Sequence, residues 1–369
     1  MYPTKKLWEI CEITTWKKDA NYSTDDWKYP FFTCWREILK SPWYSFDTDA
    51  ILIAWNWDVW ACKKFKWKFE AYQRTYVLDN FQNIEKDFLF YFLDWNLKKE
   101  LLNETLWSAI PYIKLWSLQN REIPLPPLST QKLIVEKLDM IFAEIEKSKN
   151  LLEKNLQNVD EMNKSVLEKI FANDEWERKK LGEVCEILLW WTPARDEKDF
   201  WWWENLWCSI ADMKTKIISD TKEKITDEGV KNSNVKLLKQ GTLFMSFKLS
   251  IWKLAFAGKD LFTNEAIAWL PINDENILNK EFLYYVLLWY DFSRQWSDNS
   301  VKGATLNKAK LINLEIPLPP LSTQKCIVEK LDMIFAENQK LKNLYQAQIK
   351  NLDEMKQSFL KKAFAGELV

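Results

Sequence analysis

The chain has 369 residues, and 52 Lys and Arg face 53 Asp and Glu, which gives a formal net charge of −1. This balance excludes a globally basic nucleic-acid-binding protein, so any nucleic-acid surface must be local. The chain has no His, which excludes Ser-His-Asp triads, Cys-His dyads and His general bases.

Other common sites are also absent from the sequence. The six Cys form no C-x-x-C pair, and without His a zinc site is not expected. Neither of the Gly-rich phosphate-binding patterns occurs. No stretch is long and apolar enough to cross a membrane, and the N-terminus does not read as a signal peptide. A non-catalytic cytoplasmic protein is therefore expected, with no membrane partner.

The first 120 residues predict a globular unit of mixed α/β structure. Strands are expected at 6–13, 29–33, 50–54 and 63–69, and an amphipathic helix at 88–93. In the strand 63–69, Lys residues alternate with Phe and Trp, a pattern that predicts one basic face and one apolar face. An ordinary solvated strand explains the same pattern equally well.

A long helix is expected next. Pro124, Pro126 and Pro127 favour an extended entry, after which Ser129 or Thr130 can cap the first N–H groups of a helix. Apolar residues then recur at steps of three and four without Gly or Pro as far as Phe171. This heptad seam predicts a rod of about 40 residues, roughly 60 Å long.

A second globular unit follows over 180–315. Strands or turns are expected at 184–189, 199–213, 241–247, 255–259 and 263–270. An apolar helix is expected at 282–288, and a polar, basic loop at 300–308.

The segment 123–144 returns almost unchanged at 316–337, where only Leu133 is replaced, by Cys326. The second copy also opens a helix, over 322–365, with its own heptad seam. One narrow apolar stripe needs a partner, and an antiparallel pair of these helices would put the two globular units at opposite ends. We therefore predict an α+β protein with a pseudo-two-fold internal repeat, divided into 1–127, helix 128–172, 173–320 and helix 321–369.

Tryptophan is unusually common, with 23 Trp against 6 Gly, whereas average usage of about 7% Gly would give about 26. Several Trp stand at turn positions, and the repeat aligns Trp8 with Gly182. We interpret many of these Trp as Gly encoded by UGA, but Trp176, Trp201 and Trp207 as true Trp. UGG codons at Trp8, Trp55, Trp57, Trp190 and Trp191 would end this hypothesis.

Several segments together carry a resemblance to a known family. They are IPLPPLSTQ in both halves, KLGEVCEI at 180–187 with the T-P-x-R loop after it, and KGATLNK at 302–308. The first half adds KKDAN at 17–21, and YPFFTC and AYQRTYVL further on. Over essentially its whole length the chain resembles the specificity (S) subunit of a type I restriction–modification system. The resemblance implies Gly at eight of the Trp positions, which supports the recoding hypothesis. They are Trp16, Trp27, Trp55, Trp57, Trp190, Trp191, Trp202 and Trp203.

The resemblance implies two target-recognition domains of mixed α/β structure, separated by two antiparallel conserved helices. Each domain would read one half of a bipartite site in double-stranded DNA, with the helices setting the spacing. The helices would also dock two methyltransferase subunits, and restriction subunits would join the complex. The S subunit itself would hold no catalytic centre, metal or cofactor, because S-adenosylmethionine, ATP and Mg belong to the partner subunits.

Base edges are read by Arg, Lys, Asn and Gln, and phosphates are held by Lys, Ser and Thr. On this basis the candidate DNA-binding residues of the first domain are Lys17, Lys18, Asn21, Asn56, Lys64, Gln73 and Arg74. Those of the second domain are Thr192, Arg195, Lys248, Lys253, Lys302, Asn307 and Lys308.

Two other functions fit parts of the sequence. A Trp-rich carbohydrate-binding or adhesion protein would stack its Trp on sugars, and codons and a comparison of DNA with glycan binding distinguish it. A bare coiled-coil scaffold explains the helices but not two loop-rich globular units with parallel layouts.

Overall fold

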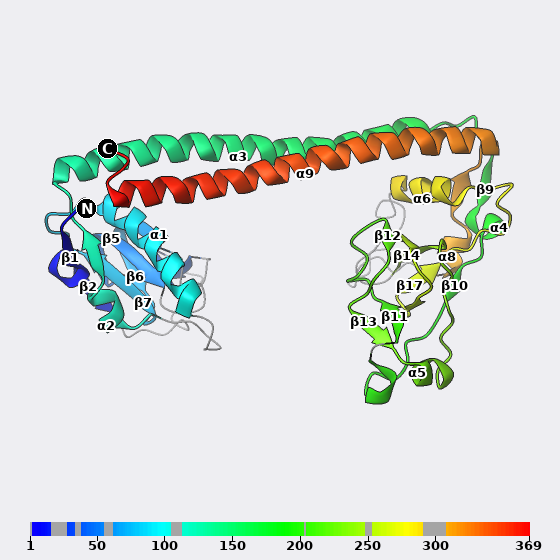
Figure 1. Ribbon diagram of the computed structural model, residues 1–369, viewed down its shortest axis with the longest axis horizontal. Coiled ribbons are helices and arrows are strands. Elements are labelled where there is room, and N and C mark those ends of the chain that lie inside the picture. The colour runs from blue at the N-terminus through cyan, green and yellow to red at the C-terminus, as the bar shows by residue number, and fades with distance from the viewer. Residues whose placement is uncertain are drawn as a thin grey trace. The chain divides into compact units, whose positions relative to one another are not determined.

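A computed structural model describes residues 2–15, 28–33, 38–54, 62–104, 113–202, 204–247, 253–290 and 308–369, with the side chains of 98–104 left aside. The described chain forms two compact units. Unit 1 contains Met1–Lys154 and Tyr345–Val369, and unit 2 contains Asn155–Leu344. The boundary runs through both long helices, so each unit holds one globular part and one half of each helix (Figure 1).

Unit 1 is built on a mixed sheet in the order β2-β7-β5-β6-β3-β4. Most neighbours in it are antiparallel, but β3 and β6 run parallel. Its strands are β2 (Glu12–Thr15), β3 (Tyr29–Phe32), β4 (Leu39–Ser41), β5 (Phe46–Ala54), β6 (Cys62–Ala71) and β7 (Thr75–Asp79). The remaining elements are β1 (Thr4–Lys6), paired with β8 (Glu122–Pro124), and the helices α1 (Lys86–Glu104) and α2 (Leu115–Gln119).

In its described residues, unit 2 contains a five-stranded sheet in the order β10-β17-β14-β15-β12, a three-stranded sheet in the order β13-β11-β16, and the two-stranded pair β18-β9. The strands of the first are β10 (Leu188–Leu189), β12 (Ile217–Ile218), β14 (Leu243–Ser246), β15 (Leu254–Ala257) and β17 (Ile267–Trp269). Those of the second are β11 (Asn205–Cys208), β13 (Glu223–Ile225) and β16 (Phe262–Thr263). The remaining elements are β9 (Arg178–Lys180), paired with β18 (Glu315–Pro317), and the helices α4 (Leu181–Val184), α5 (Asp227–Lys231), α6 (Lys280–Trp289) and α8 (Lys308–Ile312).

The two predicted long helices are α3 (Leu128–Phe171) and α9 (Leu321–Ala365). In unit 1 the ammonium of Lys149 on α3 contacts Asp353 on α9 at 2.8 Å, and Lys137 Nζ donates to the carbonyl of Leu368. Residue numbers rise along α3 while the numbers of the residues they contact fall, so the C-terminal segment runs antiparallel to α3. In unit 2 the contacts of Asp160 with Lys342 and of Asn163 with Asn338 show the same direction. The predicted α+β class, repeat and antiparallel helices are confirmed.

One continuous core in each unit joins the globular part to the helices. In unit 1 it combines Ile51 of the sheet and Phe88 of α1 with Leu138 of α3 and Leu360 of α9. In unit 2 it combines Met245 and Phe282 with Leu167 and Leu331. Burial against the sheet and the neighbouring helix therefore stabilises each rod half, because isolated helices gain little stability by themselves.

Two predicted strands are wrong in part. Residues 6–13 include a 3₁₀ turn at Leu7–Glu9, where the Glu9 carboxylate accepts from Lys6 N at 2.7 Å. Of residues 184–189, Val184 ends the short helix α4, and only Leu188 and Leu189 form a strand, β10. Lys308 begins α8 and does not lie in a loop. Within the described ranges, no helix is both long and apolar enough to span a membrane.

The tryptophans divide by burial. Trp207 is fully buried and packs edge-on against Trp201, whereas Trp191 is 76% exposed and Trp202 is 68% exposed. Trp67 on β6 has φ +144°, a backbone conformation that belongs essentially to Gly. The recoding hypothesis stays a prediction, because Trp190, which it assigns to Gly, is half-buried like Trp201, whereas Trp191 and Trp202 are exposed.

Trp67 offers a direct test of this backbone constraint. Trp67→Gly and Trp67→Ala both remove the indole, but only Gly adopts the observed φ without strain. We expect the glycine variant to be more stable than the alanine variant by about 1–3 kcal/mol, although Ala normally exceeds Gly inside strands. Urea unfolding of both variants measures the difference. An alanine variant as stable as the glycine variant would contradict the expectation.

Candidate functional site

Seven of the predicted DNA-binding residues lie in the described structure, and it does not bring them together at one place. In unit 1 they are Lys64, Gln73 and Arg74, and in unit 2 they are Thr192, Arg195, Lys253 and Lys308. The other seven, Lys17, Lys18, Asn21, Asn56, Lys248, Lys302 and Asn307, lie outside the described residues.

In unit 1, Lys64 is separated from the other two candidates. Its Nζ lies 2.6 Å from the Asp87 carboxylate on α1 and 4.8 Å from the ring centroid of Phe90. Gln73 and Arg74 form the half-buried turn between β6 and β7, closed by a bond from Thr75 N to the Tyr72 carbonyl. Lys64 therefore helps to hold α1 on the sheet, near the opposite end of β6 from the turn.

The lysines of β6 do not form an uncompensated basic face. Lys66 and Lys68 are in register with Asp49 and Asp47 of β5. Lys68 Nζ lies 3.9 Å from Asp47 and 4.6 Å from the ring centroid of Tyr44, and the hydrogen bond that Lys68 donates to the Tyr44 oxygen is the main cause that raises the pKa of Lys68. Cross-strand carboxylates thus balance the charge that the sequence pattern emphasised.

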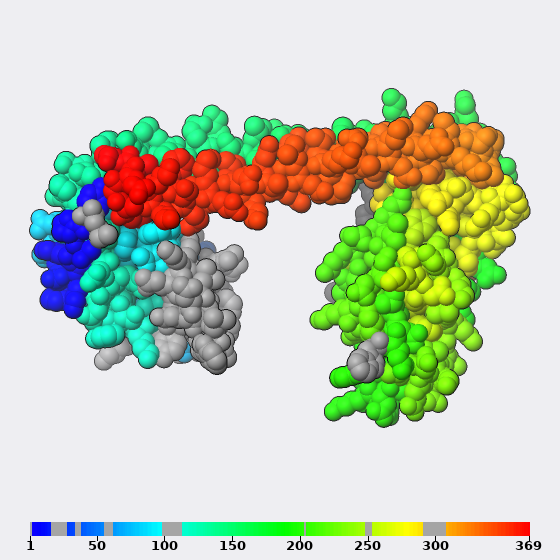
Figure 2. All heavy atoms as spheres, viewed as in Figure 1, coloured from blue at the N-terminus to red at the C-terminus, as the bar shows by residue number. Residues whose placement is uncertain are grey.

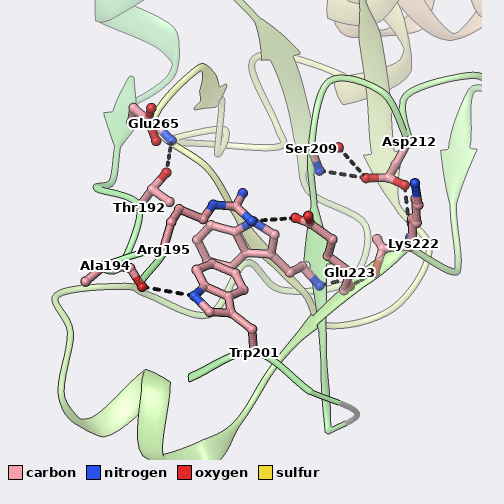
Figure 3. A network of polar contacts seen from close by, with 11 residues as sticks. Thr192, Ala194, Arg195, Trp201, Ser209, Asp212, Lys222, Glu223 and Glu265 are labelled. Atoms are coloured by element: carbon pink, nitrogen blue, oxygen red, sulfur yellow. Dashed lines mark hydrogen bonds and ion pairs between the residues drawn. The ribbon is translucent and has the colours of Figure 1, made fainter. Parts of the chain in front are cut away.

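In unit 2, Arg195 is the best-defined candidate. Its Nη1 donates to the Glu223 carboxylate at 2.8 Å, and its guanidinium lies 4.2 Å from the ring centroid of Trp201 (Figure 3). Trp201 is fixed in turn, because its indole N–H donates to the Ala194 carbonyl at 3.0 Å. The guanidinium is thus held in a defined orientation while the side chain stays 49% exposed.

A hollow of about 760 Å³ lies beside this arginine, and its lining residues are Arg195, Lys198, Asp199, Trp201, Trp202 and Glu228. Guanidinium and ammonium groups provide donors for phosphates or base edges, and the indole faces provide stacking surfaces. The carboxylates of Asp199 and Glu228 offset the positive charges of Arg195 and Lys198, so the hollow is not strongly basic. Its chemistry therefore suits a contact in which orientation and stacking contribute along with charge.

The other candidates of unit 2 have different surroundings. Thr192 Oγ1 accepts from the backbone N–H of Glu265 at 3.3 Å (Figure 3). Lys253 Nζ donates to the carbonyl of Ile210 at 3.1 Å, and Lys308 is exposed at the start of α8. Thr192 and Lys253 thus carry contacts that shape loops of unit 2.

The structure reveals a second set of polar residues that occurs once in each unit. Gln131 is fully buried, and its side chain accepts from Glu85 N at 2.7 Å and donates to the Pro126 carbonyl at 2.7 Å. Gln324 is equally buried and makes the equivalent contacts with Asn279 N and Pro319. Each glutamine therefore fastens the segment that begins α1 or α6 to its long helix.

A tyrosine–aspartate pair adds a second fastening. Tyr91 donates to Asp139 in unit 1. In unit 2, Tyr285 donates to Asp332 at 2.5 Å, and Lys216 Nζ lies 2.7 Å from the same oxygen. Both aspartates belong to the repeated segment, so identical polar residues in both copies were the signal that sequence reasoning missed.

The hydrogen bonds that Asp332 accepts predict that the stability of unit 2 depends on pH. Burial opposes ionisation of this carboxylate, but hydrogen bonds from Lys216 and Tyr285 keep its pKa below the usual range. A depressed folded pKa contributes stability above the unfolded value near 4, and this contribution is lost as pH falls through the folded pKa. We expect Asp332→Asn to destabilise unit 2 at pH 7 and to flatten the loss of stability below pH 4. Urea midpoints between pH 2 and 7 measure this, and an unchanged slope would contradict it.

The outer face of the long helices is also duplicated. Met140 on α3 is 64% exposed and its counterpart Met333 on α9 is 65% exposed. One heptad earlier, Leu133 and Cys326 are exposed as well. The surface of α9, orange to red, can be followed in Figure 2. Packing within the chain does not require exposed residues such as Met140 and Met333 to repeat.

Comparisons with known proteins agree with this duplicated plan. The family model described as "Type I restriction modification DNA specificity domain" matches residues 2–154 and 173–351. The EcoDI specificity subunit of a type I restriction enzyme from Escherichia coli is 28% identical over 404 aligned residues, which cover 100% of this chain and 88% of that protein. The EcoBI specificity subunit from the same organism is 25% identical, and that alignment covers 70% of this chain and 61% of the relative.

Solved structures show the same fold. A chain reported under "Structural basis underlying complex assembly and conformational transition of the type I R-M system" matches with a TM-score of 0.78 at 19% identity, covering 100% of this chain and 98% of that chain. The HsdS subunit from Thermoanaerobacter tengcongensis matches with a TM-score of 0.53 at 20% identity, covering 100% and 97%.

Proposed function

Because this chain belongs to the family of type I restriction–modification DNA specificity domains and carries one matched region in each half, we propose that each globular unit reads one half of a bipartite site in double-stranded DNA. Chains of this family recognise DNA and do not themselves cleave or methylate it. The observation that carries the proposal is the duplication of the fastenings. Gln131 and Tyr91 in unit 1 recur as Gln324 and Tyr285 in unit 2, while the loops that the fastened parts present differ.

The buried contacts between each globular part and the long helices suit the recognition of DNA bases. A base-contacting loop discriminates only if its carrier is held rigidly, since a misplaced donor loses its hydrogen bond. In each unit a buried glutamine, a tyrosine and an apolar core tie the globular part to the long helices. We propose that the lengths of α3 and α9 set the unread spacer between the two half-sites.

We propose two methyltransferase subunits as partners on the outer face of the helices. The exposed Met140 and Met333 occupy equivalent positions in segments that differ at one residue, so one partner surface can bind twice. Apolar side chains rimmed by charges, here Glu144 and Glu337, are typical of protein interfaces. Restriction subunits would join this assembly, and S-adenosylmethionine, ATP and Mg would be bound by the partner subunits.

The reading of each half-site is tested by Arg74→Ala and Arg195→Ala in the complex with methyltransferase subunits. Loss of one base contact costs about 1–3 kcal/mol. We expect each variant to weaken binding and to blur one half-site while the other stays as selective as in the unchanged chain. Binding to a set of duplexes with single substitutions, together with mapping of methylated adenines across a genome, measures this.

Arg178→Ala is the matched control, because Arg178 is a charged residue of the two-stranded β9–β18 pair outside the candidate site. It should leave both half-sites unchanged. Equal loss of selectivity at both half-sites in the Arg74 or the Arg195 variant would overturn modular reading.

A further inference from the structure

The seam between α3 and α9 in unit 2 contains a pair of hydrogen-bonded amides, of which Asn338 is buried and Asn163 is half-buried. Asn338 on α9 is 4% exposed, and its Nδ2 donates to Oδ1 of Asn163 on α3 at 2.6 Å. The ion pair of Lys342 with Asp160 lies one turn away. A buried amide that loses its partner is costly, so this pair discriminates among the helices that α3 and α9 can contact.

The internal repeat makes such discrimination necessary. The second copy begins 193 positions after the first, at 316 against 123. With this shift, the ion pair of Lys149 with Asp353 in unit 1 maps onto that of Lys342 with Asp160 in unit 2. Each long helix therefore carries both members of the same ion pair, and α3 can face α3 of a second chain with Lys149 opposite Asp160.

The apolar seam does not prevent this alternative. Val159 and Leu167 of α3, and Leu331 of α9, are buried aliphatic residues that pack against any similar stripe. Aliphatic shape complementarity alone selects weakly between two such partners. The ion pairs select weakly as well, since exposed pairs contribute little and recur in every combination.

The asparagines break this equivalence. The position of α3 that corresponds to Asn338 is Ile145, and the position of α9 that corresponds to Asn163 is Lys356. If two α3 helices paired in the same register, Asn163 would face Ile145. If two α9 helices paired, Asn338 would face Lys356. Only the pairing of α3 with α9 brings the two amides together.

We propose that the Asn163–Asn338 hydrogen bond selects pairing of α3 with α9 and disfavours pairing of like helices between two copies of the chain. A single buried Asn at the seam of a coiled coil is known to specify the partner at some cost in stability. The repeat supplies the competing partner, and the asymmetric amide pair opposes it. This role does not depend on DNA binding or on the methyltransferase subunits.

The test traps like-helix pairing as a disulfide in the full chain. Lys149→Cys and Asp160→Cys are combined with Cys326→Leu, which restores the residue of the first copy. The two new thiols lie eleven residues apart on α3, about 16 Å along the axis, so they are too far apart to bond within one helix. A disulfide between chains therefore reports α3 facing a second α3. Dimers formed by the chain without the introduced cysteines are subtracted.

The reporter chain is refolded from denaturant under mild oxidation with and without Asn163→Leu and Asn338→Ile. We expect at least fivefold more disulfide-linked dimer when both asparagines are replaced. Asn158→Leu, an exposed asparagine on the same helix, should leave the yield unchanged. Equal yields with and without the asparagine pair, whether high or low, would overturn the proposal.

A second measurement keeps the test independent of folding yield. Asn163→Leu alone leaves the buried Asn338 amide without its partner and should raise the unfolding equilibrium constant about tenfold, while the double replacement should restore it. Helix circular dichroism during urea unfolding reports this in each variant. A single variant no less stable than Asn158→Leu would show that the pair contributes nothing and would overturn the proposal.

Discussion

Phe171→Ala is expected to lower the free energy of unfolding of unit 2 by about 3–5 kcal/mol, the usual cost of removing a buried phenyl ring. Phe171 ends α3, is fully buried, and lies 5.6 Å from Phe282 and 5.7 Å from Trp289 between ring centroids. The alanine would leave a cavity between the end of the helix and α6. Hydrogen exchange of peptides from α6 measures the loss of protection.

Phe364→Ala is the matched variant in unit 1. Phe364 lies in the last turn of α9 and stacks on Trp95, with ring centroids 5.5 Å apart, and it also contacts Phe92. Because Phe364 is only half-buried, its loss should cost less and should appear in peptides of α1. If Phe171→Ala lowered the free energy of unfolding by less than 1 kcal/mol, the packing of the end of α3 against α6 would not be the stabilising contact inferred from the structure.

Met140→Asp and Met333→Asp should each remove one methyltransferase subunit from the complex. A carboxylate at the centre of an apolar contact must be desolvated without a partner, which costs several kcal/mol. We therefore expect at least 100-fold weaker binding at the altered copy. Sedimentation should show two bound subunits for the unchanged chain, one for each single variant and none for the double variant.

Both methionines are about two-thirds exposed, so these substitutions should leave the fold unchanged. Ile217→Asp is the control, because Ile217 is 57% exposed on β12 and has no counterpart in the repeated segment. It should keep both bound subunits. Full binding of both subunits by the double methionine variant would place the partner on another surface.

Local patterns predicted the long helices well. Apolar steps of three and four define a helical face within one segment, and the Pro-rich entries mark where α3 and α9 begin. The strand at 6–13 was wrong because the Glu9 carboxylate caps Lys6 N and turns the chain. Such a turn depends on a single side chain. An alternation of apolar and polar residues gives no sign of it.

The candidate site was less predictable. The basic strand around Lys64 suggested a DNA contact, but Asp87 and Phe90 come from α1, which follows more than twenty residues later. Residue type alone does not show whether a lysine is engaged. The Arg195 contact with Glu223 and Trp201 was similarly invisible, because it depends on how three segments of unit 2 fold together.

By itself, the sequence determined that the chain is a duplication, that each half ends in a heptad helix, and that His-dependent chemistry is absent, because these are properties of order and composition. Only the tertiary structure decided which charges are already engaged, how Gln131 and Gln324 fasten each unit, and that Asn163 meets Asn338. Those outcomes depend on contacts between residues far apart in the chain, and their energies arise only when burial removes water from both partners.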